Sequence, residues 1–371
     1  ASSVSRLIVS GCGGIKLVDS PMEFRDCIFS DFGQEYSTST INLFQSNPLI
    51  RDCSFSSNSG PAIGSGANGN SSPQIINNIL NGNVTSNSNT PQINLGTSDG
   101  FESIIIDSNQ VIGAFDNAGG IVVSTLAGGN ANAIITNNEV SNNRYGIAMI
   151  GSNISSIISN NTIIGNNIQG DPMLGGSGLN FYGGITNTSI VSHNTISENL
   201  WGVTIQLNAQ PNFGDGTIGS PGQNIIIDNQ NNFQIYALYN NTPEEIMALN
   251  NFWGTTDIEV AETYIFHEVD DASLGMVYFD PMWINPVGLI ESITTSMISI
   301  FPNPCSDYME IHDLSSRNLF YEVFNIKGQL IEKGQLINGV QRLSTFDWNR
   351  GTYFVKLDKG GEITVEKLMV W

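Results

Sequence analysis

The chain has 371 residues, of which 40% are hydrophobic and only 13% are charged, and it contains 39 glycines. This apolar content is too high for general disorder, and the length allows two or three domains. The net charge is −21 at pH 7, and residues 1–297 hold 25 acidic against 5 basic residues. Because so acidic a surface repels phosphate groups, we expect neither nucleic acid nor anionic lipid as a partner. No apolar run is long enough to form a transmembrane segment.

The chain opens on Ala1 rather than on Met. Residues 7–9 (LIV) already have the pattern of a strand within a repeating coil. We therefore expect a processed or truncated N-terminus.

Residues 24–252 repeat one short phrase: an apolar residue, two variable residues, Asn or Cys, one variable residue and a second apolar residue. The Asn or Cys positions are Cys27, Cys53, Asn78, Asn109, Asn138, Asn161 and Asn194, with degenerate copies at Asn231 and Asn250. The steps between them run from 19 to 37 residues. Such a period is typical of a solenoid, in which each repeat buries its apolar side chains against its neighbours.

A second strand follows each phrase, with apolar residues at alternate positions, as in residues 121–123, 147–149 and 179–181. A glycine often opens this strand, as expected at a corner that needs a permissive φ. No stretch of the first 240 residues combines the helical period with caps. Strands that recur without crossover helices must stack in parallel, so the sequence predicts an all-β body with the fold of a right-handed parallel β-helix.

The recurring Asn is best explained by structure rather than by catalysis. At a tight bend Asn tolerates the left-handed region, and its amide can bond the backbone. Stacked coils place identical amides above one another, where they can form a hydrogen-bonded ladder. The predicted ladder residues are Asn78, Asn109, Asn138, Asn161 and Asn194.

Cys27 and Cys53 fill the same slot one coil apart, where stacked strands lie about 4.8 Å from each other. Two buried, reduced thiols are the favoured interpretation, and a disulfide remains the alternative.

Two phrases, IITNNEVSNNRYGIAMIGS (134–152) and IVSHNTISENLWGVTIQL (190–207), resemble the parallel β-helix repeats of secreted bacterial proteins and of periplasmic copper-site maturation proteins. The resemblance covers residues 20–250 and implies a fold, not an activity. The segments NNFWGTTD (250–257) and HEVDDASLGMVYFDPMW (267–283) resemble the closing coil of such helices. We therefore expect a body over residues 1–286, closed by a coil over about 245–286 whose bulky side chains cover the open sheet edge.

Residues 287–297 have the composition of a linker, and Lys and Arg become frequent after it. Alternating strands spaced by turns predict a small β-sandwich over residues 298–371. This segment resembles the type A C-terminal sorting domain of the Bacteroidetes type IX secretion system. The matching positions are Pro302, Asn303, Pro304, Gly328, Gly351, Tyr353 and Lys367. The resemblance implies a secreted, cell-surface protein of Bacteroidetes whose partner is the type IX machinery at the outer membrane.

Two groups of side chains in the body are candidates for binding. Tyr145 and Trp201 each lie seven residues beyond their Asn anchor, so we expect them along one edge of the solenoid, where aromatic rings suit sugar faces. A buried apolar ladder is the alternative for these rings. Asp257, Asp270 and Asp271 could hold calcium through oxygen ligands, and a solvated acidic cap is the alternative. No other cofactor is expected.

These patterns favour a secreted cargo whose body acts as a binding or adhesion surface, with carbohydrate as the ligand. One alternative is a polysaccharide lyase or a glycoside hydrolase, with its site in the long insertions at residues 170–184 and 209–223. Another is a structural spacer. The sequence pairs no two carboxylates and predicts no catalytic residue, so whether the protein is an enzyme stays open.

Overall fold

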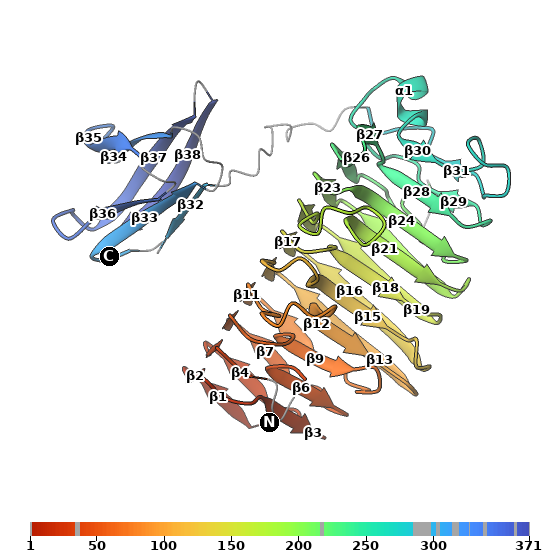
Figure 1. The fold of residues 1–371 in the computed structure, drawn as a ribbon, viewed down its shortest axis with the longest axis horizontal. Helices are drawn as coiled ribbons and strands as arrows, with labels where there is room; N and C mark the ends of the chain where they lie inside the picture. Colours follow the sequence, from red (N-terminus) through yellow and green to blue (C-terminus); the bar gives the residue numbers. More distant parts are fainter. Residues whose placement is uncertain are drawn as a thin grey trace. The chain divides into compact units, whose positions relative to one another are not determined.

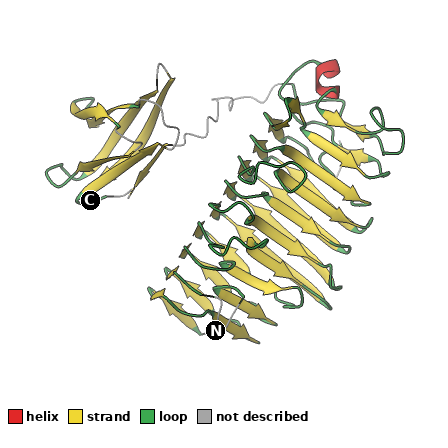
Figure 2. Ribbon diagram, viewed as in Figure 1, coloured by secondary structure: helices red, strands yellow, loops and turns green. Residues whose placement is uncertain are grey.

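The computed structural model describes residues 2–33, 38–215, 219–284, 298–301, 305–313, 319–325, 327–336, 340–359 and 362–370. The chain divides into two compact units, Ala1–Val287 and Gly288–Trp371. Strands and turns account for nearly all of the described residues, and Figure 2 shows one short helix among them. None of the helical segments in these ranges has the length and apolarity needed to span a membrane. The expected linker at 287–297 lies outside the described residues.

The first unit is a parallel β-helix whose walls are three long parallel sheets (Figure 1). Sheet A contains β1 (Ser3–Ser5), β4 (Glu23–Arg25), β7 (Leu49–Arg51), β10 (Gln74–Ile76), β13 (Phe101–Asp107), β16 (Asn130–Thr136), β19 (Ile154–Ser159) and β22 (Asn187–Ser192). Sheet B contains β2 (Ile8–Ser10), β5 (Ile28–Ser30), β8 (Ser54–Ser56), β11 (Ile79–Asn81), β14 (Gln110–Ile112), β17 (Glu139–Ser141), β20 (Thr162–Ile164), β23 (Thr195–Ser197) and β25 (Ile225–Ile227). Sheet C contains β3 (Ile15–Val18), β6 (Ile41–Phe44), β9 (Ile63–Gly66), β12 (Pro91–Gly96), β15 (Gly119–Ser124), β18 (Ile147–Ile150), β21 (Ser177–Gly183), β24 (Trp201–Leu207), β28 (Leu238–Asn241) and β30 (Ile265–Phe266).

The core of the β-helix consists of apolar side chains stacked in register. In sheet A, for example, Ile106, Ile135, Ile158 and Val191 form one column, and all four are fully buried. Burying a side chain of this size contributes about 1.5–3 kcal/mol relative to leaving it in water. Each coil gains this contribution only when its neighbours cover it, which is why no coil is stable alone.

The corner between sheets A and B carries a ladder of buried asparagine amides. In each rung an Nδ2 donates to the Oδ1 of the next coil, at 2.8 to 3.0 Å. Its members are Asn78, Asn109, Asn138, Asn161, Asn194, Asn224 and Asn251. Each Oδ1 also accepts the backbone N–H of the preceding member, and each Nδ2 donates to a carbonyl as well, as Asn138 does to Ile106 at 2.9 Å. The buried amides are therefore satisfied on both sides.

The ladder continues beyond its five predicted members to Asn224 and Asn251. Asn231 and Asn250, the degenerate copies of the phrase, instead donate to backbone carbonyls. The expectation that the ladder Asn itself takes the left-handed conformation is wrong, because the residue before it does so; Asn137, for example, has φ +57°. The turn thus divides two tasks between neighbours, because one residue bends the chain at the corner and the next joins the coils.

A second ladder lies at the corner between sheets B and C, and the sequence analysis missed it. Its side chains are linked at 2.7 to 3.3 Å. The members are Asn58, Asn83, Gln92, Asn143, Asn166, Asn199 and Asn229. All but Gln92 follow a first-ladder position by five residues, a spacing that the sequence does contain. Position 114, where the spacing calls for another Asn, holds Ala, and Gln92 bridges this gap.

Cys27 and Cys53 occupy the first places of the A–B ladder as free thiols. The backbone N–H of Cys53 donates to Asn78 Oδ1 at 3.0 Å, and that of Cys27 donates to Cys53 Sγ at 3.4 Å. Burial raises the pKa of the Cys53 thiol to about 12, so the side chain stays neutral at ordinary pH. Sulfur thus serves here as a weak acceptor in the position of an amide oxygen.

Glycines that open strands of sheet C are required for space rather than for φ, contrary to our expectation. Gly120, Gly146, Gly178 and Gly202 do not have a φ in the left-handed region. A Cβ on Gly146 would lie 2.4 Å from the carbonyl oxygen of Gly178 and 2.6 Å from Ile163 in the core. The coils approach too closely here for any side chain.

The C-terminal end of the β-helix departs from the regular coil. It contains β26 (Gln230–Asn231), β27 (Gln234–Ile235), β29 (Ile246–Met247), α1 (Ile258–Glu262) and β31 (Val277–Tyr278). Trp253 and Phe279 are buried there, with their rings edge to face at 6.4 Å. These bulky side chains close the core of the last coil.

The second unit is a small β-sandwich of two antiparallel sheets. One contains β32 (Ile298–Phe301), β33 (Tyr308–Asp313) and β36 (Val340–Ser344); the other contains β34 (Phe320–Asn325), β35 (Leu330–Gln335), β37 (Gly351–Lys359) and β38 (Glu362–Val370). Buried side chains of both sheets form one core. Tyr353 is buried, and its Oη donates to the carbonyl of Asn349 at 2.7 Å. Gly328 and Gly351 have φ values of +75° and +150°, which favour glycine.

Candidate functional site

The outer face of sheet C has a floor of small side chains. Ala148 of β18, Asn180 of β21 and Thr204 of β24 lie side by side in register, and Tyr239 of β28 follows Thr204. Strand alternation directs these residues outward, because their neighbours in the sequence fill the core. Three small residues followed by a tyrosine leave a depression that ends at the ring of Tyr239.

Tyr145 and Trp201 flank this floor at the side where the strands of sheet C begin. Tyr145 packs over the preceding coil, since a Cβ on Gly119 would lie 2.2 Å from its ring. Trp201 packs toward the following coil, with ring centroids 4.6 Å from Tyr236 and 5.1 Å from Tyr239. The two rings therefore lean in opposite directions. In the coil between them, the position that pairs with Trp201 in register holds only the small side chain of Ser177.

A twelve-residue loop at 165–176, between β20 and β21, forms a wall of the depression. Arg144 holds one side of it, donating from Nε to the Leu174 carbonyl at 2.7 Å, from Nη2 to the same oxygen, and from Nη1 to Asn89 Oδ1. Trp201 holds the other side through a 3.0 Å hydrogen bond from Nε1 to the carbonyl of Pro172. The loop is therefore anchored at both sides by side chains of neighbouring coils.

Together these elements enclose what we call the sheet C pocket, of about 570 Å³. Apart from Arg144 and the aromatic side chains, its polar lining consists of amides and hydroxyls: Asn89, Asn180, Gln206, Asn241, Ser177 and Thr204. No Asp or Glu is among the described residues that line it. The Oδ1 of Asn180 is buried and has no hydrogen-bond partner among the described residues.

Arg144 is the only Lys or Arg between residues 52 and 297. Burial raises the pKa of the neighbouring Tyr145 phenol to about 12, although the positive charge of Arg144 opposes the shift. The phenol thus stays protonated at physiological pH and can donate a hydrogen bond.

We expected Tyr145 and Trp201 along one edge of the solenoid, with a buried apolar ladder as the alternative; in the structure both rings are partly exposed and line one pocket. The loop at 165–176 accounts for this partial burial, because it lies beside the two rings and forms a wall of the pocket. Sequence reasoning also missed Arg144 and Asn180. A lone cation in a long acidic segment was a usable signal for Arg144. No sequence signal marked Asn180, because its position on the strand depends on where the preceding loop ends.

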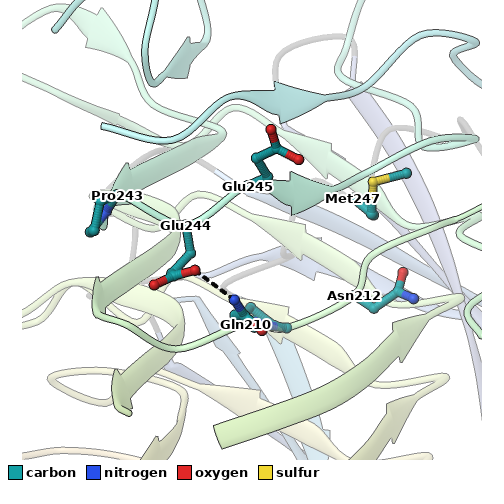
Figure 3. A pocket seen from close by; sticks show the side chains of 7 residues that line it. Gln210, Asn212, Pro243, Glu244, Glu245 and Met247 are labelled. Carbon is teal, nitrogen blue, oxygen red and sulfur yellow. Dashed lines mark hydrogen bonds between the residues drawn. The ribbon is translucent and has the colours of Figure 1, made fainter. Parts of the chain in front are cut away.

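A second pocket, of about 460 Å³, lies near the C-terminal end of the β-helix (Figure 3). It contains Glu244 and Glu245, the only pair of carboxylates in either pocket among the described residues. Glu244 accepts hydrogen bonds from Gln210 Nε2 at 2.7 Å and from Asn208 Nδ2 at 2.9 Å. Figure 3 shows the carboxylate of Glu245 pointing away from that of Glu244, and it accepts from Tyr278 Oη at 3.2 Å. The two groups do not face one another across a substrate site.

The three aspartates considered for calcium bind neighbours in their own segments. Asp257 caps the N-terminus of α1, Asp270 accepts the backbone N–H of His267 at 3.1 Å, and Asp271 accepts from Ser273. The backbone hydrogen bond from Ser273, with that from its hydroxyl, lowers the pKa of Asp271. The described residues contain no group of three or more His, Cys, Asp or Glu side chains that could hold a metal ion.

Comparisons with known proteins agree with the division into two units. Residues 299–371 match the family described as Secretion system C-terminal sorting domain. Residues 123–258 match a family described only as Protein of unknown function (DUF1565), and this segment includes Arg144, Tyr145, Asn180 and Trp201. No curated protein matches the chain. The matches and the sheets together define a parallel β-helix protein with a C-terminal sorting domain. The protein is a cargo of the type IX secretion system, exported to the cell surface.

Proposed function

We propose that the β-helix body binds carbohydrate in the sheet C pocket, and that the exported protein thereby acts as a binding or adhesion surface. The observation that carries this proposal is the composition of the pocket. Aromatic rings stand at its ends, amides and hydroxyls form its floor, and its described lining contains no carboxylate. Sugars present apolar C–H faces and hydroxyl edges, so they fit a site of aromatic rings with a few placed hydrogen-bonding groups.

The same composition favours binding over hydrolysis. Glycoside hydrolases use two carboxyl groups about 5–10 Å apart on either side of the scissile bond. The described lining of the sheet C pocket offers none, and the pair in the second pocket does not converge. An enzyme would therefore need groups from outside both pockets, whereas a binding site needs only what the sheet C pocket contains.

The test is a polysaccharide panel against the purified full chain, read for retention and for released product. Retention without product is expected. Trp201→Phe keeps an aromatic ring but removes the Nε1 donor that holds Pro172, and it should weaken retention several-fold. Phe101→Ala is the matched control, because Phe101 is an aromatic residue 64% exposed on sheet A, outside the pocket. Released product, or equal loss in both variants, would contradict the proposal.

A further inference from the structure

The geometry points to the ligand class: we infer that the sheet C pocket selects an uncharged, hydroxyl-rich sugar over a uronate, and that Asn180 is a specificity-determining residue. This inference rests on the proposed function, because it assumes that the ligand is a carbohydrate. Three observations carry it: the chemistry of the pocket floor, the hydrogen bonds of Arg144 and the charge of the body.

The floor presents an acceptor that needs a donor. Asn180 lies between Ala148 and Thr204 on the outer face of sheet C, and its Oδ1 is buried without a partner among the described residues. The nearby hydroxyls of Ser177 and Thr204 are 2.9 Å apart and bond each other. A sugar hydroxyl placed on this oxygen can donate a hydrogen bond, whereas an ionised carboxylate only accepts. A neutral sugar can therefore satisfy the Oδ1 of Asn180, whereas a carboxylate at the same place leaves this oxygen unsatisfied.

The single cation of the pocket is already engaged. A guanidinium recognises a carboxylate best through two parallel N–H donors. In Arg144 the Nε and Nη2 donors both serve the Leu174 carbonyl, and Nη1 serves Asn89. Arg144 therefore holds the wall of the pocket instead of offering a carboxylate clamp. No other Lys or Arg is present between residues 52 and 297 to replace it.

The charge of the body adds to this selectivity. Residues 1–297 hold 25 acidic and 5 basic residues. Two of these basic residues, Arg25 and Arg51, lie near the N-terminal end of the solenoid, away from the pocket, and form ion pairs with carboxylates there. The negative electrostatic field of the body disfavours negatively charged ligands, and this repulsion weakens as the salt concentration rises. A polyuronate would have to approach against this field, while a neutral glycan would not.

The experiment compares matched ligands on the purified full chain. The probes are hexasaccharides of β-1,4-glucose, β-1,4-mannose, β-1,4-galactose and α-1,4-glucose, each beside its C6-oxidised uronate form. For at least one pair we expect the neutral form to bind at least about tenfold more tightly, since a site built to bond a hydroxyl rejects a group that cannot donate. Raising the salt concentration should leave binding of the neutral form unchanged, because no charge pair supports it.

Variants of Asn180 test its role. Asn180→Ala should weaken binding of the neutral form by about tenfold, because the acceptor is lost, and should narrow the preference over the uronate. Asn180→Asp keeps an acceptor at this position, so it should retain the neutral sugar and reject the uronate further. Asn132→Ala is the matched control, since Asn132 lies on the outer face of sheet A, away from the pocket.

The outcomes separate the two proposals. Uronates that bind as tightly as the neutral forms, or an Asn180→Ala variant that binds like the parent, would overturn this inference. The proposal of carbohydrate binding would still stand if Trp201→Phe weakened the binding of these sugars. No binding by any of the eight probes would overturn the inference together with the proposed function.

Discussion

The two ladder corners of the β-helix share their chemistry but differ in the length of the connection between their strands. Between sheets A and B the connection has two residues in successive coils, as at 108–109, 137–138, 160–161 and 193–194. Between sheets B and C it varies from three residues at 198–200 to twelve at 165–176. The sheet C pocket lies beside the variable corner, whereas the constant corner contributes nothing to it. The constant corner thus supplies rigidity, and the variable one supplies a wall that a rigid sheet can position.

The largest effect should come from breaking the constant corner. In Asn138→Leu, the carbonyl of Ile106, the Oδ1 of Asn161 and both the backbone N–H and the Nδ2 of Asn109 lose a hydrogen-bond partner in the core. We expect the free energy of unfolding to fall by about 3 kcal/mol, because buried polar groups without partners are costly. Denaturant unfolding of the full chain measures the change. An unaltered midpoint would show that the ladder does not stabilise the fold.

A smaller effect should come from changing only the turn residue beside the ladder. Asn160 has φ +57° and is exposed, so Asn160→Ala places a less tolerant residue in the left-handed region while the ladder stays intact. The expected loss is about 1 kcal/mol, and Asn160→Gly should be close to neutral. If Asn160→Ala cost as much as Asn138→Leu, the proposed division of tasks between the two residues would be wrong.

The contrast between the corners also explains what could be predicted from the sequence. A constant two-residue turn keeps a constant pattern, so the period, the parallel stacking and the ladder at Asn78 to Asn194 could be derived from spacing alone. At position 221, three residues before Asn224, the phrase has Pro in place of its usual leading Ile, Val or Phe, and the ladder position at Asn224 was missed. The offset of seven residues placed Tyr145 and Trp201 on one edge. It could not place the loop at 165–176, because an insertion has no repeat to show where it folds.

The sorting domain could be predicted for a different reason. Its strands alternate at regular spacing, and its short motifs match a known family, so neither depends on stacking between coils. Pro302, Asn303 and Pro304, three of the positions that carried the resemblance, lie outside the described residues. Lys367 lies on β38, opposite Phe354 of β37.

The smallest effect on stability should come from the variable corner. Arg144→Lys keeps the charge but cannot reproduce the forked donation to Leu174 and Asn89. Since these groups are near the surface, the free energy of unfolding should change by less than about 0.5 kcal/mol. Amide exchange in residues 165–176 should nevertheless become faster, and binding of a neutral sugar should weaken several-fold, because the wall of the pocket loses an anchor. The ladder at Asn138 should keep its protection, which serves as the internal control. If exchange in the loop stayed slow while binding fell, Arg144 would contact the ligand directly, and its engagement by Leu174 would no longer argue against acidic sugars.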